Sequence, residues 1–156
     1  MNRIETLRLL FREIGILGIE ASTRLARVLP RNLTETQFGL LNHLHFTTNV
    51  DETPADLARA FKVSRPAMTQ ILRRLVDRGF VELRPAPGDG RLRHVTLTAA
   101  GDEAHEAVLE ALGKDFEAMA THSSAGELAD LLTALRHFRQ TVEAVPVAGP
   151  AGEDVA

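Results

Sequence analysis

Residues 64–75 combine an apolar helical stripe with side chains that suit contacts to a polyanion. The stripe consists of Met68, Ile71, Leu72 and Leu75. The other face carries Ser64, Arg65, Thr69, Gln70, Arg73 and Arg74. Arginine can pair with two acceptors on a guanine edge, and glutamine can pair in a similar way with adenine. We therefore expect Arg65 and Gln70 to contact bases, while the other polar side chains of this face suit phosphates.

The charge of the surrounding segment supports this interpretation. Between Arg59 and His94 there are nine Lys or Arg residues and three acids, which gives this segment a net charge of +6. The whole chain has a net charge of −3, so the remaining residues carry −9. A basic segment inside an acidic protein indicates a polyanion partner at one place on the molecule.

Two short helices joined by a tight turn are predicted to position these side chains. A Thr-Pro pair at residues 53–54 is typical of a helix start and predicts a helix over 54–61. Residues 62–63 make the turn, and Ser64 caps a second helix that stops at Gly79. A helix-turn-helix of this kind places the start of its second helix in the DNA major groove.

Two alternating strand patterns follow, over residues 80–84 and 91–97, with a Pro- and Gly-rich loop tip over 85–90. Together they predict a β-hairpin, the wing of a winged helix. Arginine suits a narrow, electronegative minor groove, and we expect Arg91 there with Asp89 holding its guanidinium. The complete set of expected DNA-contacting residues is Ser64, Arg65, Pro66, Thr69, Gln70, Arg73, Arg74, Arg84, Asp89, Arg91 and Arg93.

Further helical patterns cover residues 3–29, 35–46, 99–121 and 124–144. The order of elements predicts a mainly α fold with one small β-hairpin. The apolar stripes of the first and last helices find no other large partner in the chain, so we expect burial against a two-fold copy. The alternative is a monomer in which these two helices pack on each other. Residues 145–156 are expected to be a disordered tail.

Six short segments, in this order and spacing, match one known family. They are LTETQF at 33–38, DLA at 56–58, VSRPAMT at 63–69, LVDRGFV at 75–81, DGR at 89–91 and VTLTAAG at 95–101. With these segments the chain resembles the MarR family of transcriptional regulators. The resemblance implies a homodimeric winged-helix protein that binds a pseudo-palindromic DNA operator, usually as a repressor that a small effector releases. In the family the aspartate and arginine of the wing pair, and Asp89 and Arg91 match those positions.

The resemblance also implies a division of the chain. Residues 1–144 form the MarR-type domain, in which residues 33–98 are the DNA-binding part. Residues 3–29 and 99–144 are the dimerisation helices, and the tail of residues 145–156 lies outside the domain.

Relatives that sense small aromatic acids bind them in a crevice between the dimer helices and the winged helix. Arg12, His43 and His45 are the candidates for lining such a crevice around an aromatic or phenolic effector.

Zinc-sensing relatives take their ligands from three helices, and here Glu20, His43 and His105 are the residues of suitable type. Leu109 stands where a second histidine of the fifth helix would be needed, so we expect no metal site and interpret the histidines as structural.

The composition excludes several classes of function. There is no cysteine among the 156 residues, which excludes thiol catalysis, disulfides, cysteine-based redox sensing and cysteine-ligated zinc. No apolar run approaches the ~20 residues of a membrane span, and the N-terminus lacks a secretory pattern, so we expect a soluble, cytoplasmic protein. There is no nucleophile–base spacing or phosphate loop, so we expect neither an enzyme nor a cofactor. The alternatives are a metal-responsive regulator of the same fold and a winged-helix protein–protein adaptor.

Overall fold

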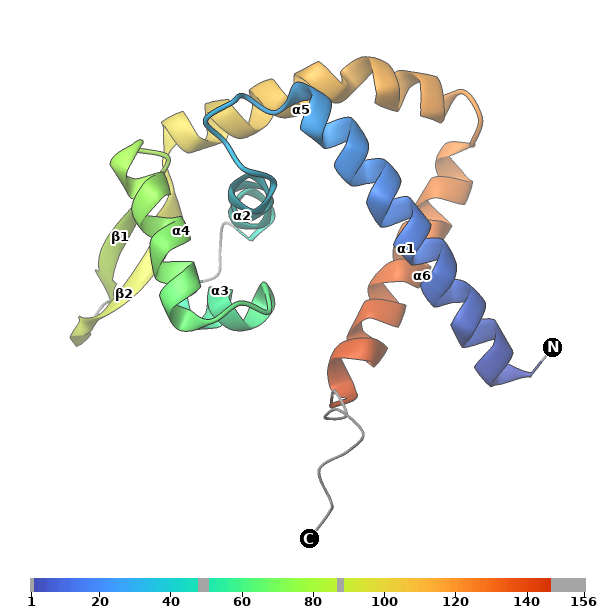
Figure 1. Ribbon diagram of the computed structural model, residues 1–156, viewed down its shortest axis with the longest axis horizontal. Helices are drawn as coiled ribbons and strands as arrows, with labels where there is room; N and C mark the ends of the chain where they lie inside the picture. The colour runs from blue at the N-terminus through green and yellow to red at the C-terminus, as the bar shows by residue number, and fades with distance from the viewer. Residues whose placement is uncertain (1, 48–50, 87–88, 147–156) are drawn as a thin grey trace, which may run out of the picture. The chain divides into compact units, whose positions relative to one another are not determined.

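The computed structural model describes residues 2–47, 51–86 and 89–146, and for residues 89–91 it describes the backbone alone. The elements in chain order are α1 (Arg3–Val28), α2 (Glu35–Phe46), α3 (Pro54–Ala60), α4 (Arg65–Asp77), β1 (Val81–Ala86), β2 (Asp89–Leu97), α5 (Ala99–Ala120) and α6 (Ala125–Ala144) (Figure 1). The expected mainly α fold with one hairpin is confirmed. The chain divides into two compact units, Met1–Gly113 and Lys114–Ala156. The predicted disorder of residues 147–156 concerns a segment outside the described residues.

Side-chain caps begin the two helices of the helix-turn-helix. At the start of α3 the Thr53 hydroxyl accepts the Asp56 N–H at 3.2 Å, and the Asp56 carboxylate accepts the Thr53 N–H at 3.0 Å. The hydrogen bond from the Thr53 side chain is the main cause that lowers the pKa of Asp56. At the start of α4 the Ser64 hydroxyl accepts the Ala67 N–H at 3.3 Å. Both predicted caps are therefore confirmed.

A tight turn ends α3. The Lys62 N–H donates to the Arg59 carbonyl at 3.2 Å, and the Val63 N–H donates to the Ala58 carbonyl at 3.0 Å. This Schellman arrangement requires a residue in the left-handed region, which is usually glycine. Here Lys62 takes that place with φ 54°. The turn predicted at residues 62–63 is confirmed. Its left-handed position, where glycine is common, is occupied by a lysine.

The same arrangement ends α4. Gly79, with φ 72°, donates its N–H to the Val76 carbonyl at 2.8 Å, and the Phe80 N–H donates to the Leu75 carbonyl at 2.9 Å. The predicted stop at Gly79 is confirmed. Because the Phe80 N–H is used in this turn, the first strand begins one residue later than predicted, at Val81.

The hairpin of β1 and β2, called the wing below, is antiparallel with Val81 opposite Leu97 and Pro85 opposite Arg93. A register shift follows Pro85, and Ala86 then pairs with Asp89. The prediction of a loop over residues 85–90 is therefore wrong, because both strands continue into it. Pro85 is tolerated because a two-stranded hairpin has open edges, where a missing N–H need not break a ladder bond.

One hydrophobic core holds the first unit together. Its fully buried leucine and methionine side chains are Leu40, Leu41, Leu57, Met68 and Leu75. Val81 and Val95 add one side chain from each strand of the wing, and Val108 adds one from α5. The stripe predicted for α4 is confirmed, with Leu72 also buried and Ile71 half-buried. This shared core holds α4 and the wing together in one packed unit.

Two helices lack any buried side chain. No residue of α1 or of α6 is buried. The exposed apolar side chains of α1 include Ile4, Leu9, Phe11, Leu17 and Ile19. Those of α6 include Leu128, Leu131, Leu132, Leu135 and Val142. None of the described helices has the length and apolar character that crossing a membrane requires.

Candidate nucleic-acid interface

The N-terminal end of α4 is open to solvent. Ser64, Arg65 and Pro66 are all exposed, and the first turn contains no acidic residue. The first N–H groups of a helix lack partners within the helix and carry a partial positive charge. The Ser64 cap uses the N–H of Ala67, and Pro66 has no N–H. The N–H of Arg65 and the helix dipole therefore remain to receive a phosphate.

The face of α4 opposite the core carries the predicted polar residues. Thr69, Gln70, Arg73 and Arg74 are exposed, as is Arg65 one turn earlier. Within the described part of the chain, no carboxylate pairs with Arg65, Arg73 or Arg74. The Thr69 hydroxyl donates to the Arg65 carbonyl at 2.9 Å, so its proton is used and its oxygen remains an acceptor. Three guanidinium groups are therefore available to an external anion along this face.

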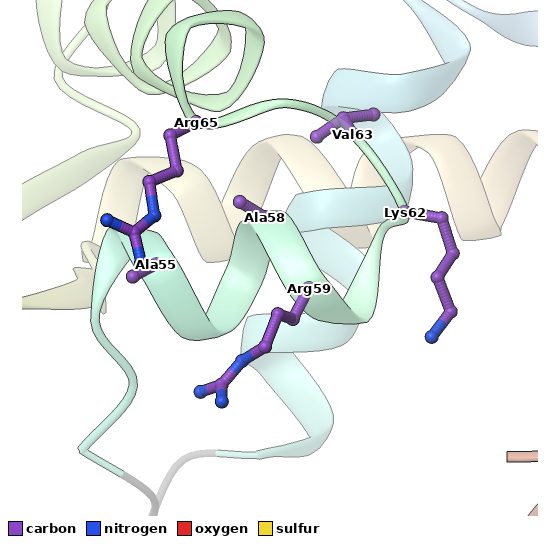
Figure 2. Close-up of a pocket in the computed structure, with 6 residues that line it drawn as sticks. All are labelled: Ala55, Ala58, Arg59, Lys62, Val63 and Arg65. Carbon is purple, nitrogen blue, oxygen red and sulfur yellow. The ribbon is translucent and has the colours of Figure 1, made fainter. Parts of the chain in front are cut away.

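A basic pocket lies between α3 and the start of α4. Its volume is about 460 Å³, and it is lined by Ala55, Ala58, Arg59, Lys62, Val63 and Arg65. Figure 2 shows the cationic side chains of Arg59, Lys62 and Arg65 around small apolar residues. Arg59 also pairs with the Asp56 carboxylate, which holds it beside α3.

A second hollow joins α4 to the wing. It has a volume of about 320 Å³ and is lined by Thr53, Pro54, Ala55, Arg65, Thr69, Leu92 and Arg93. Arg65 lines both hollows, so it lies at the centre of a surface made by α3, α4 and β2. Three of these lining residues, Arg65, Thr69 and Arg93, are among those predicted from the sequence to contact DNA.

Arg59 and Lys62 are not among the residues predicted from the sequence to contact DNA. Both counted toward the basic segment, and that charge was the signal that could have identified them. The left-handed backbone at Lys62, which sets where its side chain leaves the turn, has no counterpart in the sequence pattern.

The wing supplies further cations. Arg84 and Arg93 are exposed, although Arg84 pairs with the neighbouring Glu82 carboxylate. The predicted pair of Asp89 and Arg91 concerns side chains outside the described residues. His94 is 15% exposed and faces inward, with its Nδ1 3.5 Å from the Asp51 carboxylate.

The histidines group differently from the set suggested by zinc-sensing relatives. His43 Nε2 lies 2.7 Å from the Glu52 carboxylate, and Glu20 lies 3.8 Å from Arg24 on α1. His105 instead lies against His45, with ring centroids 4.3 Å apart.

The three residues predicted to line an effector crevice each lie next to a carboxylate. Arg12 pairs with the adjacent Glu13 on α1. His43 and His45 face different carboxylates, those of Glu52 and Asp102.

This chain is similar in sequence and fold to known proteins. The model of the MarR family matches residues 31–92. The multiple antibiotic resistance protein MarR of Escherichia coli K12 is 33% identical over 103 residues, which are 65% of this chain and 70% of that protein.

Solved structures of the Escherichia coli protein extend the match. Its apo crystal structure has a TM-score of 0.64 at 30% identity and covers 83% of this chain and 96% of that one. A mutant of the same protein, complexed with operator DNA, has a TM-score of 0.63 at 27% identity over 88% of this chain and 99% of that one.

Proposed function

The chain belongs to the MarR family and is a DNA-binding transcription regulator rather than an enzyme, and we propose that it is a homodimeric repressor of a pseudo-palindromic operator. The single observation that carries the proposal is the basic face of α4, whose arginines have no carboxylate partner among the described residues, beside two hollows lined by Arg65. Its relative of known structure binds operator DNA with the same fold. A protein that acts on chromosomal DNA in this way works in the cytoplasm.

The α4 residues divide into base-reading and phosphate-binding groups. Arg65 and Gln70 are the candidates for base edges because they can form paired hydrogen bonds with guanine and adenine. Ser64, Thr69, Arg73 and Arg74 bind phosphates, as does the N-terminus of α4 next to Pro66. Arg59 and Lys62 extend the phosphate-binding surface along the basic pocket.

The wing reaches the neighbouring minor groove in this proposal. Arg91 enters the groove, Asp89 orients its guanidinium, and Arg84 and Arg93 contact the backbone on either side. The exposure of Arg84 and Arg93 on paired strands supports this placement.

The dimer is supported by the absence of buried side chains in α1 and α6. Apolar faces as large as these are usually covered by a partner. A second copy is the simplest partner, because a closed two-fold pair covers the same face on both chains. It also places two α4 helices to read half-sites about 34–36 Å apart, as a palindrome requires.

Release from DNA by a small molecule completes the proposed function. Aromatic and phenolic acids are the first compounds to screen, with Arg12, His43 and His45 as the candidate contacts. Loss of operator binding in the presence of one such compound, without loss of the dimer, would support this part of the proposal.

The test of DNA reading begins by selecting bound sequences from random duplex DNA. The affinity of Arg65→Ala is then compared with the unmutated protein on the selected operator and on a scrambled duplex. We expect a loss of about 1–3 kcal/mol on the operator and weaker preference at one base pair. The control is Arg139→Ala, which removes an exposed arginine of α6 paired with Glu143.

Each outcome has a defined meaning. An equal loss of affinity on both duplexes would show that Arg65 contacts only phosphate. No loss on either duplex, or no selected consensus, would contradict the proposed interface.

A further inference from the structure

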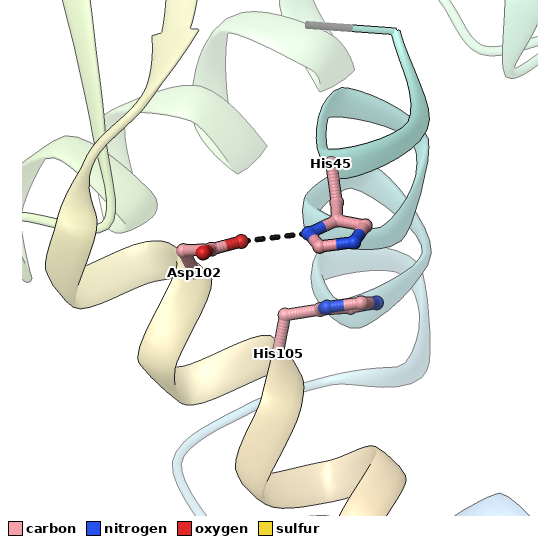
Figure 3. A group of neighbouring side chains, drawn as sticks. All are labelled: His45, Asp102 and His105. Atoms are coloured by element: carbon pink, nitrogen blue, oxygen red, sulfur yellow. Dashed lines mark hydrogen bonds and ion pairs between the residues drawn. The ribbon is translucent and has the colours of Figure 1, made fainter.

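A group of two histidines and an aspartate connects α2 to the start of α5. His45 comes from α2, while Asp102 and His105 come from the first turns of α5, and all three belong to the first unit. His45 Nδ1 lies 2.6 Å from the Asp102 carboxylate. One ligand atom from each residue lies within 4.8 Å of the other two. Figure 3 shows the two imidazoles one above the other, with Asp102 beside His45.

His105 is prepared to act as a ligand through one specific atom. Its side chain is fully buried, and its Nε2 lies 3.0 Å from Asn42 Oδ1. The Asn42 oxygen can only accept, so His105 Nε2 carries the proton and Nδ1 carries the lone pair. That Nδ1 is buried without a hydrogen-bond partner among the described residues.

The hydrogen bond from Nε2 to Asn42 also fixes the orientation of the His105 ring. A hydrogen bond from the opposite ring nitrogen to an oxygen acceptor is also the usual way in which proteins orient metal-binding histidines.

From this geometry we propose that His45, Asp102 and His105 bind one divalent cation of the zinc class. Two imidazole nitrogens and a carboxylate oxygen form a donor set that Zn²⁺ commonly takes, and the chain has no thiolate to compete. The orphaned Nδ1 of His105 gains a partner when the cation is bound.

The distances fit a tetrahedral ion after a small adjustment. Bond lengths of about 2.0–2.2 Å place the ligand atoms of a tetrahedral zinc roughly 3.3–3.5 Å apart. His45 and Asp102 must therefore separate by less than 1 Å from their direct hydrogen bond. The half-exposed His45 ring must also turn, because stacked rings direct their lone pairs in parallel. Glu106 Oε1 lies 3.6 Å from His105 Nδ1, so this carboxylate or a water can take the fourth position.

This site is distinct from the one suggested by zinc-sensing relatives. It uses neither Glu20 nor His43, and Leu109 plays no part in it. The inference is also independent of the proposed operator binding, because its test measures the metal directly.

The experiment uses the full chain without a histidine tag, stripped with a chelator and titrated with Zn²⁺ against a coloured competitor. We expect one ion per chain, and we expect Asp102→Asn and His45→Gln each to weaken binding by at least about tenfold. The matched control is His43→Gln, two residues from His45 on the same helix, whose zinc affinity should stay within about twofold. Circular dichroism of each metal-free variant establishes that it is folded.

A Co²⁺ titration gives a second measurement. Four-coordinate cobalt with nitrogen and oxygen ligands should give visible absorption that disappears in Asp102→Asn. The proposal is overturned if zinc does not saturate at one site per chain. It is equally overturned if folded Asp102→Asn and His45→Gln bind as well as the unmutated chain, or if His43→Gln is weakened as much as they are.

Discussion

Replacing Gly101 with alanine should destabilise the protein, although the same change in an ordinary helix is stabilising. A Cβ at this position would lie 2.9 Å from the Phe80 carbonyl carbon and 2.8 Å from Leu97 Cδ1, and closer still to the Phe80 oxygen. That oxygen accepts the Thr98 N–H at 3.1 Å. The added methyl therefore pushes the start of α5 away from the end of α4.

The size of the effect follows from three contributions. Alanine gains about 1 kcal/mol over glycine in a helix. Overpacking against backbone costs about 1–3 kcal/mol, and loss of the hydrogen bond between Thr98 and Phe80 costs about 1 kcal/mol more. The net free energy of unfolding should fall by roughly 1–3 kcal/mol, and at about 2–4 °C per kcal/mol the Tm should fall by roughly 2–12 °C.

The control lies in the same helix. Gly113 has no atom within 4 Å of an added Cβ. Gly113→Ala should therefore show the helix preference alone and raise the Tm by about 2–4 °C. Both variants are compared with the unmutated protein by differential scanning calorimetry at one protein concentration, because the proposed dimer would make the Tm depend on concentration. If Gly101→Ala raises the Tm as Gly113→Ala does, the close approach of Phe80 is refuted.

Three further predictions concern assembly, the wing and pH. Leu17→Glu should convert the proposed dimer to a monomer in sedimentation without unfolding it, because Leu17 is 60% exposed within the chain; a retained dimer would remove α1 from the interface. Arg91→Ala should abolish tight operator binding in a mobility-shift assay while sedimentation still finds a dimer, and unchanged affinity would exclude the wing. Hydrogen bonds from the backbone and hydroxyl of Ser124 lower the pKa of Glu127 below its ordinary value of 4.5. A lowered folded-state pKa gives stability that is present above about pH 4.5 and lost as the pH falls below it. Glu127→Gln keeps a capping residue but cannot titrate, so its Tm should fall less steeply with acid, and identical slopes would contradict the assignment.

Much of the fold could be predicted because local chemistry determines it. The caps at Thr53 and Ser64 and the stop at Gly79 depend on residues within one turn of each other. The wing was harder, because proline and glycine at its tip are typical of loops. Whether Pro85 can remain in a strand depends on its lying in a two-stranded hairpin with open edges, which is tertiary information.

Part of the functional surface could also be predicted from the sequence. The exposed face of α4 follows from the spacing of Met68 and Leu75, since the core side determines the opposite side. The group of His45, Asp102 and His105 could not be predicted, because 57 residues separate Asp102 from His45. Composition and spacing carry no information on which helix faces meet across such a distance.

The left-handed turn at Lys62 has a consequence for how this protein can change over generations. Glycine at position 62 would relieve backbone strain of roughly 1–2 kcal/mol. It would also remove one of the cations that line the basic pocket. Selection for heat tolerance and selection for operator affinity therefore favour different residues at this single position. A laboratory screen that rewards heat tolerance alone should recover glycine there repeatedly, and those variants should bind operator DNA weakly.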